Sequence, residues 1–408
     1  MNLLTAWIRK SKLVTLCRGL VLLLVALLLF LVWLWHSPAV LVSHGMPPRD
    51  SETPERNVTP AQRSSHDLIR DPLDFEELSG QLEQLLLRSS DLTNGNFTIP
   101  CRPDGDRLAC RSNCSRPLNA SPKLRLWDLA TSAKLTLSDE QVDAILALTE
   151  ALPTSDYILL SASSHDHYHE MQSMFYNLHT VFTPQSENVS LVLLDIGLTE
   201  EQRKMTEKHC RCQVLDFPFY KFPRHSSNRH CYTWKPLIIL SALQRVRKVL
   251  IYQDSSIRWL RSGSELISRA QDVGMQLLRS PRSSRVPMHA LEKTFDYFEE
   301  KPCAFSVFPE LHAGFSLFKP EAFAVNAILK PWARCALEAS CMCPVFPKAV
   351  IGCSKRETEH GCHRFDQSCL SIITGKLFNE HLYKFTVPNS RFIDIKRFAD
   401  HPGYFNST

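Results

Sequence analysis

Carboxylates stand at the ends of two apolar segments that are typical of buried strands. Residues 189–195 end at Asp195, and residues 248–254 end at Asp254. In α/β folds, active sites lie beyond the carboxyl ends of the strands, so both side chains are placed where chemistry can occur. A carboxylate at such a position can hold Mn²⁺ or Mg²⁺, because these ions prefer oxygen ligands. The sequence therefore predicts a polar site at one edge of a sheet.

Each of these candidates also has a purely structural interpretation. Asp195 opens the turn Asp-Ile-Gly-Leu, and the sequence favours that role over contact with a ligand. Asp254 can cap the turn after its strand, although we expect a functional role for it. Lys235 can either face the site or be a solvated charge at the start of a helix. These alternatives remain open without a structure.

The elements that must position these residues alternate between strands and helices. We expect strands at 156–162, 189–195, 212–217 and 248–254, and later at 313–319 and 382–387. We expect helices at 138–151, 165–181, 199–209, from Pro236 onward, at 320–330 and at 366–374. Ser138 with Gln141, and Thr199 with Gln202, have the spacing of helix N-terminal caps. Such alternation predicts an α/β fold with a mainly parallel sheet.

Several motifs carry a resemblance to a known fold family. The helix Trp-Lys-Pro-Leu-Ile-Ile followed by a strand ending in Asp254-Ser255-Ser256 resembles GT-A nucleotide-sugar glycosyltransferases, in which a helix with a cation precedes a D-x-D motif. The strand that begins at His312 resembles the N-A-G-x-x-L-F strand of glycogenin-like transferases, and Asp366-Gln367 resembles the D-Q that follows it. Residues 155–390 look closer still to a family of transferase-like proteins described only as a domain of unknown function.

The resemblance implies a Rossmann-like GT-A nucleotide-diphospho-sugar transferase fold. It implies transfer of a sugar from a nucleotide-sugar donor, with Mn²⁺ or Mg²⁺ neutralising the diphosphate as a Lewis acid. Asp254 and Asp366 are the implied catalytic residues, although Asp366 can instead be a helix N-cap. The implied metal ligands are Asp254, Ser256 and His401. The implied donor-binding residues are Lys235, Asp195, Arg258, Gly314 and Gln367.

The D-x-D position departs from the family pattern. Ser256 stands in place of the second carboxylate, and a hydroxyl is a poorer, neutral ligand. Metal affinity should fall, so either other residues compensate or the metal is dispensable. His401-Pro-Gly403 has the form of the late H-x-G ligand of glycogenin-like enzymes. The lost carboxylate also keeps a second function open, namely a non-catalytic lumenal protein that binds a glycan or a partner on the same fold.

The N-terminus predicts a membrane anchor. The 408-residue chain has one strongly apolar segment, Gly19–Trp35, and residues 37–42 can extend it to the roughly 20 residues that span a bilayer. Lys and Arg are frequent between residues 9 and 18, and no positive charge follows until Arg49, so the N-terminus is expected in the cytosol. A cleaved signal peptide would have a shorter apolar region and a small-residue cleavage site. We therefore expect a single-pass type II protein with a signal anchor.

Sequons and cysteines indicate a lumenal location for the rest of the chain. N-x-[ST] motifs occur at Asn57, Asn96, Asn113, Asn119, Asn188 and Asn406. All but Cys17 of the 14 cysteines follow the anchor, in a compartment where disulfides persist. The odd number of lumenal cysteines leaves a thiol that is free or pairs between chains, which would allow a disulfide-linked homodimer. The C-x-C spacing of Cys341 and Cys343 favours disulfides over zinc.

The predicted organisation has four parts. These are a cytoplasmic tail (1–18), a transmembrane signal anchor (19–42), a lumenal stem (43–125) and a lumenal GT-A-like domain (126–408). A helical patch at 71–87 either associates stems or packs on the domain. The net charge of +5 is spread without a basic stripe, which argues against nucleic acid as a partner. The expected location is the Golgi or endoplasmic-reticulum membrane, with a glycan or glycoprotein as acceptor. A third interpretation is a structural surface glycoprotein that dimerises through the odd cysteine.

Overall fold

A computed structural model describes residues 68–88, 121–183, 188–281, 284–344, 353, 362–389 and 391–406. All of them belong to one compact unit, Ala61–Thr408. Among these residues, no helix combines the length and the apolar character that crossing a membrane requires. The predicted tail and signal anchor, residues 1–42, lie outside the described residues, as do the sequons at 57, 96, 113 and 119.

A seven-stranded sheet forms the centre of the unit, in the order β3-β2-β1-β4-β7-β6-β8. The pairs from β3 through β4 are parallel, β7 is antiparallel to both of its neighbours, and β6 pairs in parallel with β8. The predicted α/β fold with a mainly parallel sheet is confirmed. The strands are β1 (Ser155–Ser163), β2 (Val189–Asp195), β3 (Gln213–Asp216), β4 (Val246–Gln253), β6 (Met275–Arg279), β7 (Leu311–Phe318) and β8 (Thr386–Pro388). A separate antiparallel pair is formed by β5 (Ile257–Trp259) and β9 (Ile393–Ile395).

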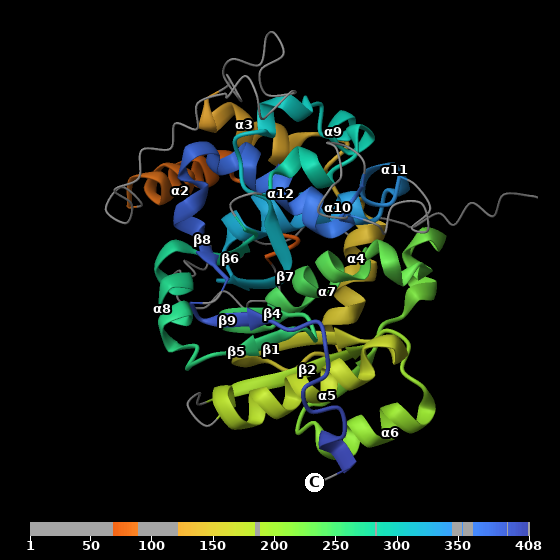
Figure 1. Ribbon diagram of the computed structural model, residues 1–408. Helices are drawn as coiled ribbons and strands as arrows, with labels where there is room; N and C mark the ends of the chain where they lie inside the picture. Colours follow the sequence, from red (N-terminus) through yellow and green to blue (C-terminus); the bar gives the residue numbers. More distant parts are fainter. Residues whose placement is uncertain are drawn as a thin grey trace, which may run out of the picture. The chain divides into compact units, whose positions relative to one another are not determined.

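Helices cover both faces of the sheet (Figure 1). Alternate side chains of β1 define the two faces, since Leu159 joins one apolar core and Ile158 and Leu160 join the other. The core containing Leu159 includes residues of α5 (Tyr168–Asn177) and α8 (Ser264–Val273), with α6 (Glu200–His209) packed against it. The other core includes residues of α4 (Asp139–Thr149), α7 (Trp234–Leu243), α9 (Glu292–Tyr297), α10 (Lys330–Ala336), α11 (Ala339–Met342) and α12 (Phe365–Phe378).

Two helices begin at the capping boxes that the sequence predicts. Ser138 accepts from the Gln141 backbone N–H ahead of α4, and Thr199 accepts from the Gln202 backbone N–H ahead of α6. In both cases the glutamine side chain accepts from the backbone N–H of the capping residue in return. The two helices therefore start where local chemistry fixes them, and this sets the connections into β1 and out of β2.

The helical patch at 71–87 is found as α2 (Phe75–Arg88), and it packs on the folded unit. Leu78, Leu82 and Leu85 are buried in the core. The backbone N–H of Ile69 donates to the Gln244 side chain at 3.0 Å. With α3 (Pro122–Thr131), α2 places part of the segment assigned to a stem against the α/β core.

Some predicted elements differ from the structure. The strand expected at 382–387 is mostly a 3₁₀ helix, Asn379–Phe385, and only residues from Thr386 onward pair with β6. The helix expected at 165–181 begins as a 3₁₀ turn and ends in a π-helical segment, Leu178–Phe182. Strands β5, β6 and β9 were not predicted. Each is five residues or shorter, so its apolar pattern is too brief to identify from the sequence.

Disulfides account for most of the described cysteines. The pairs are Cys210–Cys212, Cys231–Cys343, Cys335–Cys341 and Cys353–Cys362. The prediction of disulfides in the C-terminal cysteine cluster is confirmed. The free cysteine of the described residues is Cys369, which is fully buried and therefore not accessible for a bond to a second chain.

Candidate functional site

Asp254 lies at the point where the sheet changes its direction of winding. From β1 the chain continues outward to β2 and β3 on one side, and it then returns to β4 on the other side of β1. In open α/β sheets, ligands bind outside the carboxyl ends of the strands at such a switch point. Asp254 follows the last residue of β4, and its backbone N–H donates to the Gly314 carbonyl of β7 at 2.8 Å. This hydrogen bond to β7 fixes the backbone position of Asp254 at the end of β4.

Three charged side chains meet there from distant parts of the chain. The Nζ atom of Lys235, on the first turn of α7, lies 3.1 Å from Oδ1 of Asp254 and 2.7 Å from Oδ2 of Asp366, on the first turn of α12. Lys235 and Asp366 are 3% and 6% exposed, whereas Asp254 is 30% exposed. Asp254 is therefore the member of the cluster that a ligand can reach.

The surroundings of Lys235 stabilise its charged form. Its ammonium lies over the rings of Tyr232, Tyr252 and Trp234, at 5.2, 5.4 and 5.7 Å from their centroids. Burial lowers the pKa of Lys235, but the two aspartates outweigh burial and raise it. For Asp254 the effects have the opposite sign, because burial alone would raise its pKa. The charge of Lys235 and the Tyr252 hydroxyl, which donates to Oδ1 at 2.6 Å, outweigh burial, so the pKa of Asp254 is lowered.

Asp366 differs from Asp254 in the balance of these effects. Burial raises the pKa of Asp366, and the nearby Lys235 opposes the rise without cancelling it. One lysine thus lies between a carboxyl with a lowered pKa and a carboxyl with a raised pKa. Such a difference between two acids is typical of sites in which they have different roles.

Gly314 gives Asp254 and His312 the space that they occupy. A Cβ atom at position 314 would lie 2.6 Å from Oδ2 of Asp254 and 2.8 Å from Cε1 of His312. His312 is held by the Gly314 backbone N–H, which donates to its Nδ1 at 3.2 Å. Burial lowers the pKa of His312 to about 4, so the ring is neutral at physiological pH. The structure places Gly314, predicted as a donor-binding residue, directly against the charged cluster.

The remaining predicted donor residues are placed differently. Gln367 follows Asp366, is buried, and its Nε2 has no hydrogen-bond partner among the described residues. Arg258 is only 3% exposed and donates to three backbone carbonyls and to Asp400. Asp195 accepts from the backbone N–H groups of Gly197 and Leu198 and pairs with Arg203. The polar groups of Arg258 and Asp195 are therefore engaged within the protein, at positions where the sequence predicted contact with a donor.

The described residues do not assemble a divalent-metal site around Asp254. Its Oδ1 accepts from the Tyr252 hydroxyl and lies 3.1 Å from Nζ of Lys235, and its Oδ2 accepts from the same Nζ at 3.4 Å. The His401 ring stacks on Tyr176, with centroids 3.6 Å apart, and Ser256 offers only a hydroxyl. Within the described part of the chain, the two groups of three His, Cys, Asp or Glu ligands are His289 with Cys353 and Cys362, and Cys335 and Cys341 with Cys369; each contains a disulfide, and neither includes Asp254. The predicted metal set of Asp254, Ser256 and His401 does not fit such an ion.

Two site residues escaped the sequence analysis. Tyr252 is two residues before Asp254, so the period of a strand puts both on one face, and this signal was available. His312 belongs to the quoted β7 motif, but its approach to Asp254 depends on the antiparallel pairing of β4 with β7. That pairing is not visible in the sequence.

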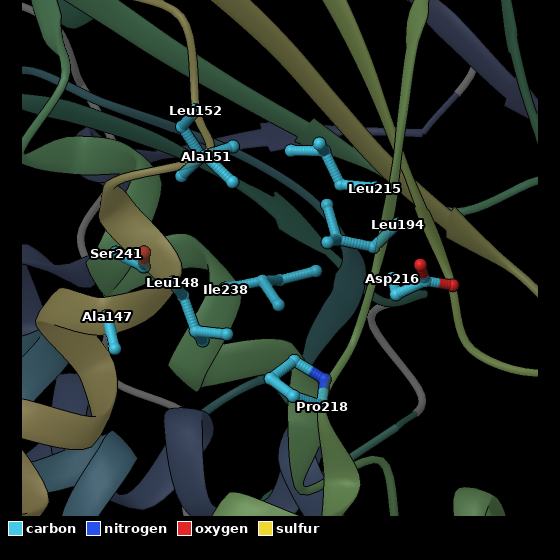
Figure 2. Close-up of a pocket in the computed structure, with 10 residues that line it drawn as sticks. All are labelled: Ala147, Leu148, Ala151, Leu152, Leu194, Leu215, Asp216, Pro218, Ile238 and Ser241. Carbon is cyan, nitrogen blue, oxygen red and sulfur yellow. The ribbon is translucent and has the colours of Figure 1, made fainter.

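A separate cleft lies between α4, α7 and the carboxyl ends of β2 and β3. Figure 2 shows its side chains, among them Leu148, Leu194, Leu215 and Ile238, pointing toward one space. Its volume of about 80 Å³ is far below the roughly 300–1,000 Å³ of typical small-molecule sites. The cleft shares no residue with the charged cluster, so we do not assign the ligand to it.

Comparison with known proteins gives a family match and a set of structural likenesses. Residues 123–240 match a family described as "Protein of unknown function (DUF1647)", a match that includes Lys235 and ends before Asp254. No curated protein matches the sequence.

The similar solved structures include several glycosyltransferases. One is the WbbM bifunctional glycosyltransferase (11% identity, TM-score 0.33), which aligns with 56% of this chain, while the chain spans only 38% of that protein. Another is galactosyltransferase LgtC with donor and acceptor sugar analogues (15% identity, TM-score 0.31, 57% of this chain and 73% of that one). A third is core-mannan synthase A from Aspergillus fumigatus in its Mn/GDP form (8% identity, TM-score 0.35, 59% and 74%). Residues 123–240 are thus similar to a family of unknown function, and the chain is similar in fold to several solved glycosyltransferases.

Proposed function

We propose that this protein is a glycosyltransferase that moves a sugar from a nucleotide-sugar donor to a lumenal acceptor. The observation that carries the proposal is the Lys235–Asp254–Asp366 cluster at the switch point of the sheet. It brings together the cation of the helix, the carboxylate of the D-x-D position and the D-Q carboxylate, the elements on which the sequence resemblance depends. A cluster that joins α7, β4 and α12 is more specific than any one of the motifs.

The residues have separate roles in this proposal. Asp254, the exposed member, accepts hydrogen bonds from hydroxyl groups of the donor. Lys235 holds Asp254 and Asp366 in fixed positions and offsets their negative charge. Asp366, which is 6% exposed and whose pKa is raised by burial, shapes the acceptor side from beneath together with the unpaired amide of Gln367. Preorganised groups of this kind stabilise charge that develops in the transition state.

The proposed location is the lumen of the Golgi or endoplasmic reticulum, with residues 19–42 as the anchor of a type II protein. The four described disulfides support an oxidising compartment. Asn188 and Asn406, the two sequons within the described residues, are both exposed and so accessible to glycosylation. A glycan or glycoprotein in the same compartment is the proposed acceptor.

A second function is favoured by one observation. Ser256 replaces the second carboxylate, and Oδ1 of Asp254 is already engaged, so the site has fewer free ligands than a metal-dependent transferase needs. The alternative is a non-catalytic protein that binds a glycan or a partner protein at this crevice.

Thermal melting of the full chain in detergent, against UDP- and GDP-sugars, tests the proposal. A ligand that binds only the folded state raises the midpoint by mass action. We expect one donor to raise it and Asp254→Asn to abolish the shift. Asp156→Asn is the matched control, because Asp156 lies at the amino end of β1 in a partly exposed ion pair. Binding followed by release of the free sugar or its transfer supports the enzyme, whereas a shift with glycans alone supports the second function.

A further inference from the structure

A nucleotide-sugar site must neutralise a diphosphate, and the cations next to Asp254 are already committed. Lys235 pairs with two aspartates, and Arg258 is buried on carbonyl oxygens and Asp400. Arg364, at the start of α12, pairs with Glu310 at 3.1 Å. Each of these three cations is already paired with a carboxylate of the protein, and the residues around Asp254 do not fit a divalent metal.

A short loop after β9 lies beside the strand end that carries Asp254. In the antiparallel β5–β9 pair, Ile257 is opposite Ile395, and the next backbone N–H, that of Lys396, donates to the Ser256 carbonyl at 2.8 Å. Arg397 is the next residue after Lys396, so the chain at Arg397 leaves from beside Ser256, two residues after Asp254. The loop is therefore set against the edge of the crevice by backbone hydrogen bonds.

The far end of this loop is also fixed. Asp400 Oδ1 pairs with Nε of Arg258 at 3.2 Å, and its Oδ2 pairs with Nζ of Lys396 at 3.1 Å. Residues 396–400 are thus held at both ends, with Arg397 and Phe398 between the two attachments. A loop held in this way presents its side chains without a large loss of backbone entropy when a ligand binds.

Arg397 is the unpaired cation of this loop. Its side chain is exposed, and it has no ion-pair or hydrogen-bond partner among the described residues. Its charge reaches the site, because it adds to the burial that lowers the pKa of His312 and acts on Tyr232 beside Lys235. The Phe398 side chain, at the next position in the loop, is 63% exposed, and the Lys396 ammonium lies over its ring at 6.0 Å from the centroid.

We infer that Arg397 binds the diphosphate of the nucleotide ligand and that its guanidinium takes the place of a divalent metal at this site. A guanidinium suits the task, since its planar set of donors matches phosphate oxygens in pairs. The inference rests on the proposed function, and it adds the phosphate-binding residue and the independence from metal.

The test is titration of the full chain in detergent with UDP and GDP, in EDTA and in Mn²⁺, with uridine and guanosine as phosphate-free probes. We expect the diphosphate to bind equally well in both buffers. Arg397→Gln should weaken its binding by about 10- to 100-fold while leaving the nucleoside unchanged. Arg391→Gln is the matched control, because Arg391 is on the same segment, is exposed, and pairs with Glu265.

Three outcomes would overturn the inference, and they differ in what they leave standing. Binding that requires Mn²⁺ would restore the metal and keep the proposed function. Metal-independent binding that Arg397→Gln leaves intact would place the phosphate elsewhere. If wild-type protein bound no nucleotide in either buffer while remaining folded by its melting curve, the proposed function would fail and the inference with it.

Discussion

Arg258 and Asp400 form an ion pair that joins the end of the chain to the strand following Asp254. The distance from Nε to Oδ1 is 3.2 Å, and the two residues are 142 positions apart. The same guanidinium donates to the carbonyls of Ser255, Ile257 and Glu170 at 2.7, 3.0 and 3.2 Å. Arg258 therefore connects β5, α5 and the C-terminal segment.

Arg258→Lys should lower the free energy of unfolding by about 2–4 kcal/mol, because a lysine cannot reproduce the buried fork of hydrogen bonds. Urea unfolding measures the change. The control is Arg391→Lys, whose pair with Glu265 is half-exposed and whose loss should cost no more than about 0.5 kcal/mol. Unchanged stability together with weakened nucleotide binding would instead support the donor-binding role that the sequence predicts for Arg258.

Gly314→Ala should destabilise the protein by about 1–3 kcal/mol and disturb the site, since the added methyl would overlap both Asp254 and His312. Gly80→Ala is the matched control, and it should change the stability in the opposite direction. Its Cβ would meet nothing within 4 Å, and an alanine inside α2 should stabilise that helix by about 0.5–1 kcal/mol. Melting curves of both variants, with and without nucleotide, separate the two effects. Nucleotide binding unaffected by Gly314→Ala would show that the site tolerates the displacement.

His363 should make stability fall in mild acid. Its Nε2 lies 3.1 Å from the Met342 carbonyl, and its Nδ1 accepts from the Leu291 backbone N–H, so both nitrogens are used in the neutral form. Burial lowers the pKa of His363 to about 4. As the pH falls, His363 takes up a proton in the unfolded chain before it does so in the folded protein. The contribution of neutral His363 to the free energy of unfolding is therefore complete above about pH 6.5 and is lost as the pH falls toward 4.

The expected loss from this one residue is about 3 kcal/mol at most. Urea unfolding at several pH values measures it. In His363→Asn the stability should be lower at neutral pH but should fall less between pH 6.5 and 4. Parallel curves for the two proteins would contradict the prediction.

Cys369 should be inert toward thiol reagents in the native protein. The residue is fully buried, and burial raises its pKa well above the usual range, so neither access nor thiolate is available. Cys369→Ser should leave the number of reactive thiols unchanged in native protein and reduce it by one in denaturant. A dimer band on a non-reducing gel that disappeared in Cys369→Ser would contradict the buried position.

Much of the scaffold followed from local signals. The strand that ends just before Asp254 contains a short apolar run, residues 249–252, and the capping boxes at Ser138 and Thr199 fixed two helix starts. The last predicted strand failed because residues 382–385 are apolar enough for a strand but form a buried 3₁₀ turn. An alternating or apolar pattern reports burial, and both structures can provide it.

The site was predictable only in part, because its geometry depends on contacts between distant segments. Lys235 and Asp366 were each identified from a motif, but nothing local shows that their side chains meet across 131 positions. For the same reason, the sequence predicts Arg258 as a donor-binding residue, whereas its guanidinium donates to carbonyl oxygens and to Asp400. Arg397 belongs to no motif, and only the β5–β9 register brings it near Asp254.

The burial of the charged cluster has an evolutionary consequence. Lys235 lies at the N-terminal end of α7, where the helix dipole disfavours a cation, and a buried charged triad is often no more stable than apolar residues of similar size. A lineage that no longer used the site would therefore lose little by replacing the cluster with apolar residues, and could even gain thermal stability. Joint retention of Lys235, Asp254 and Asp366 in diverged homologues would thus record continued selection for activity, and coordinated loss of all three would mark the branches where the activity ended.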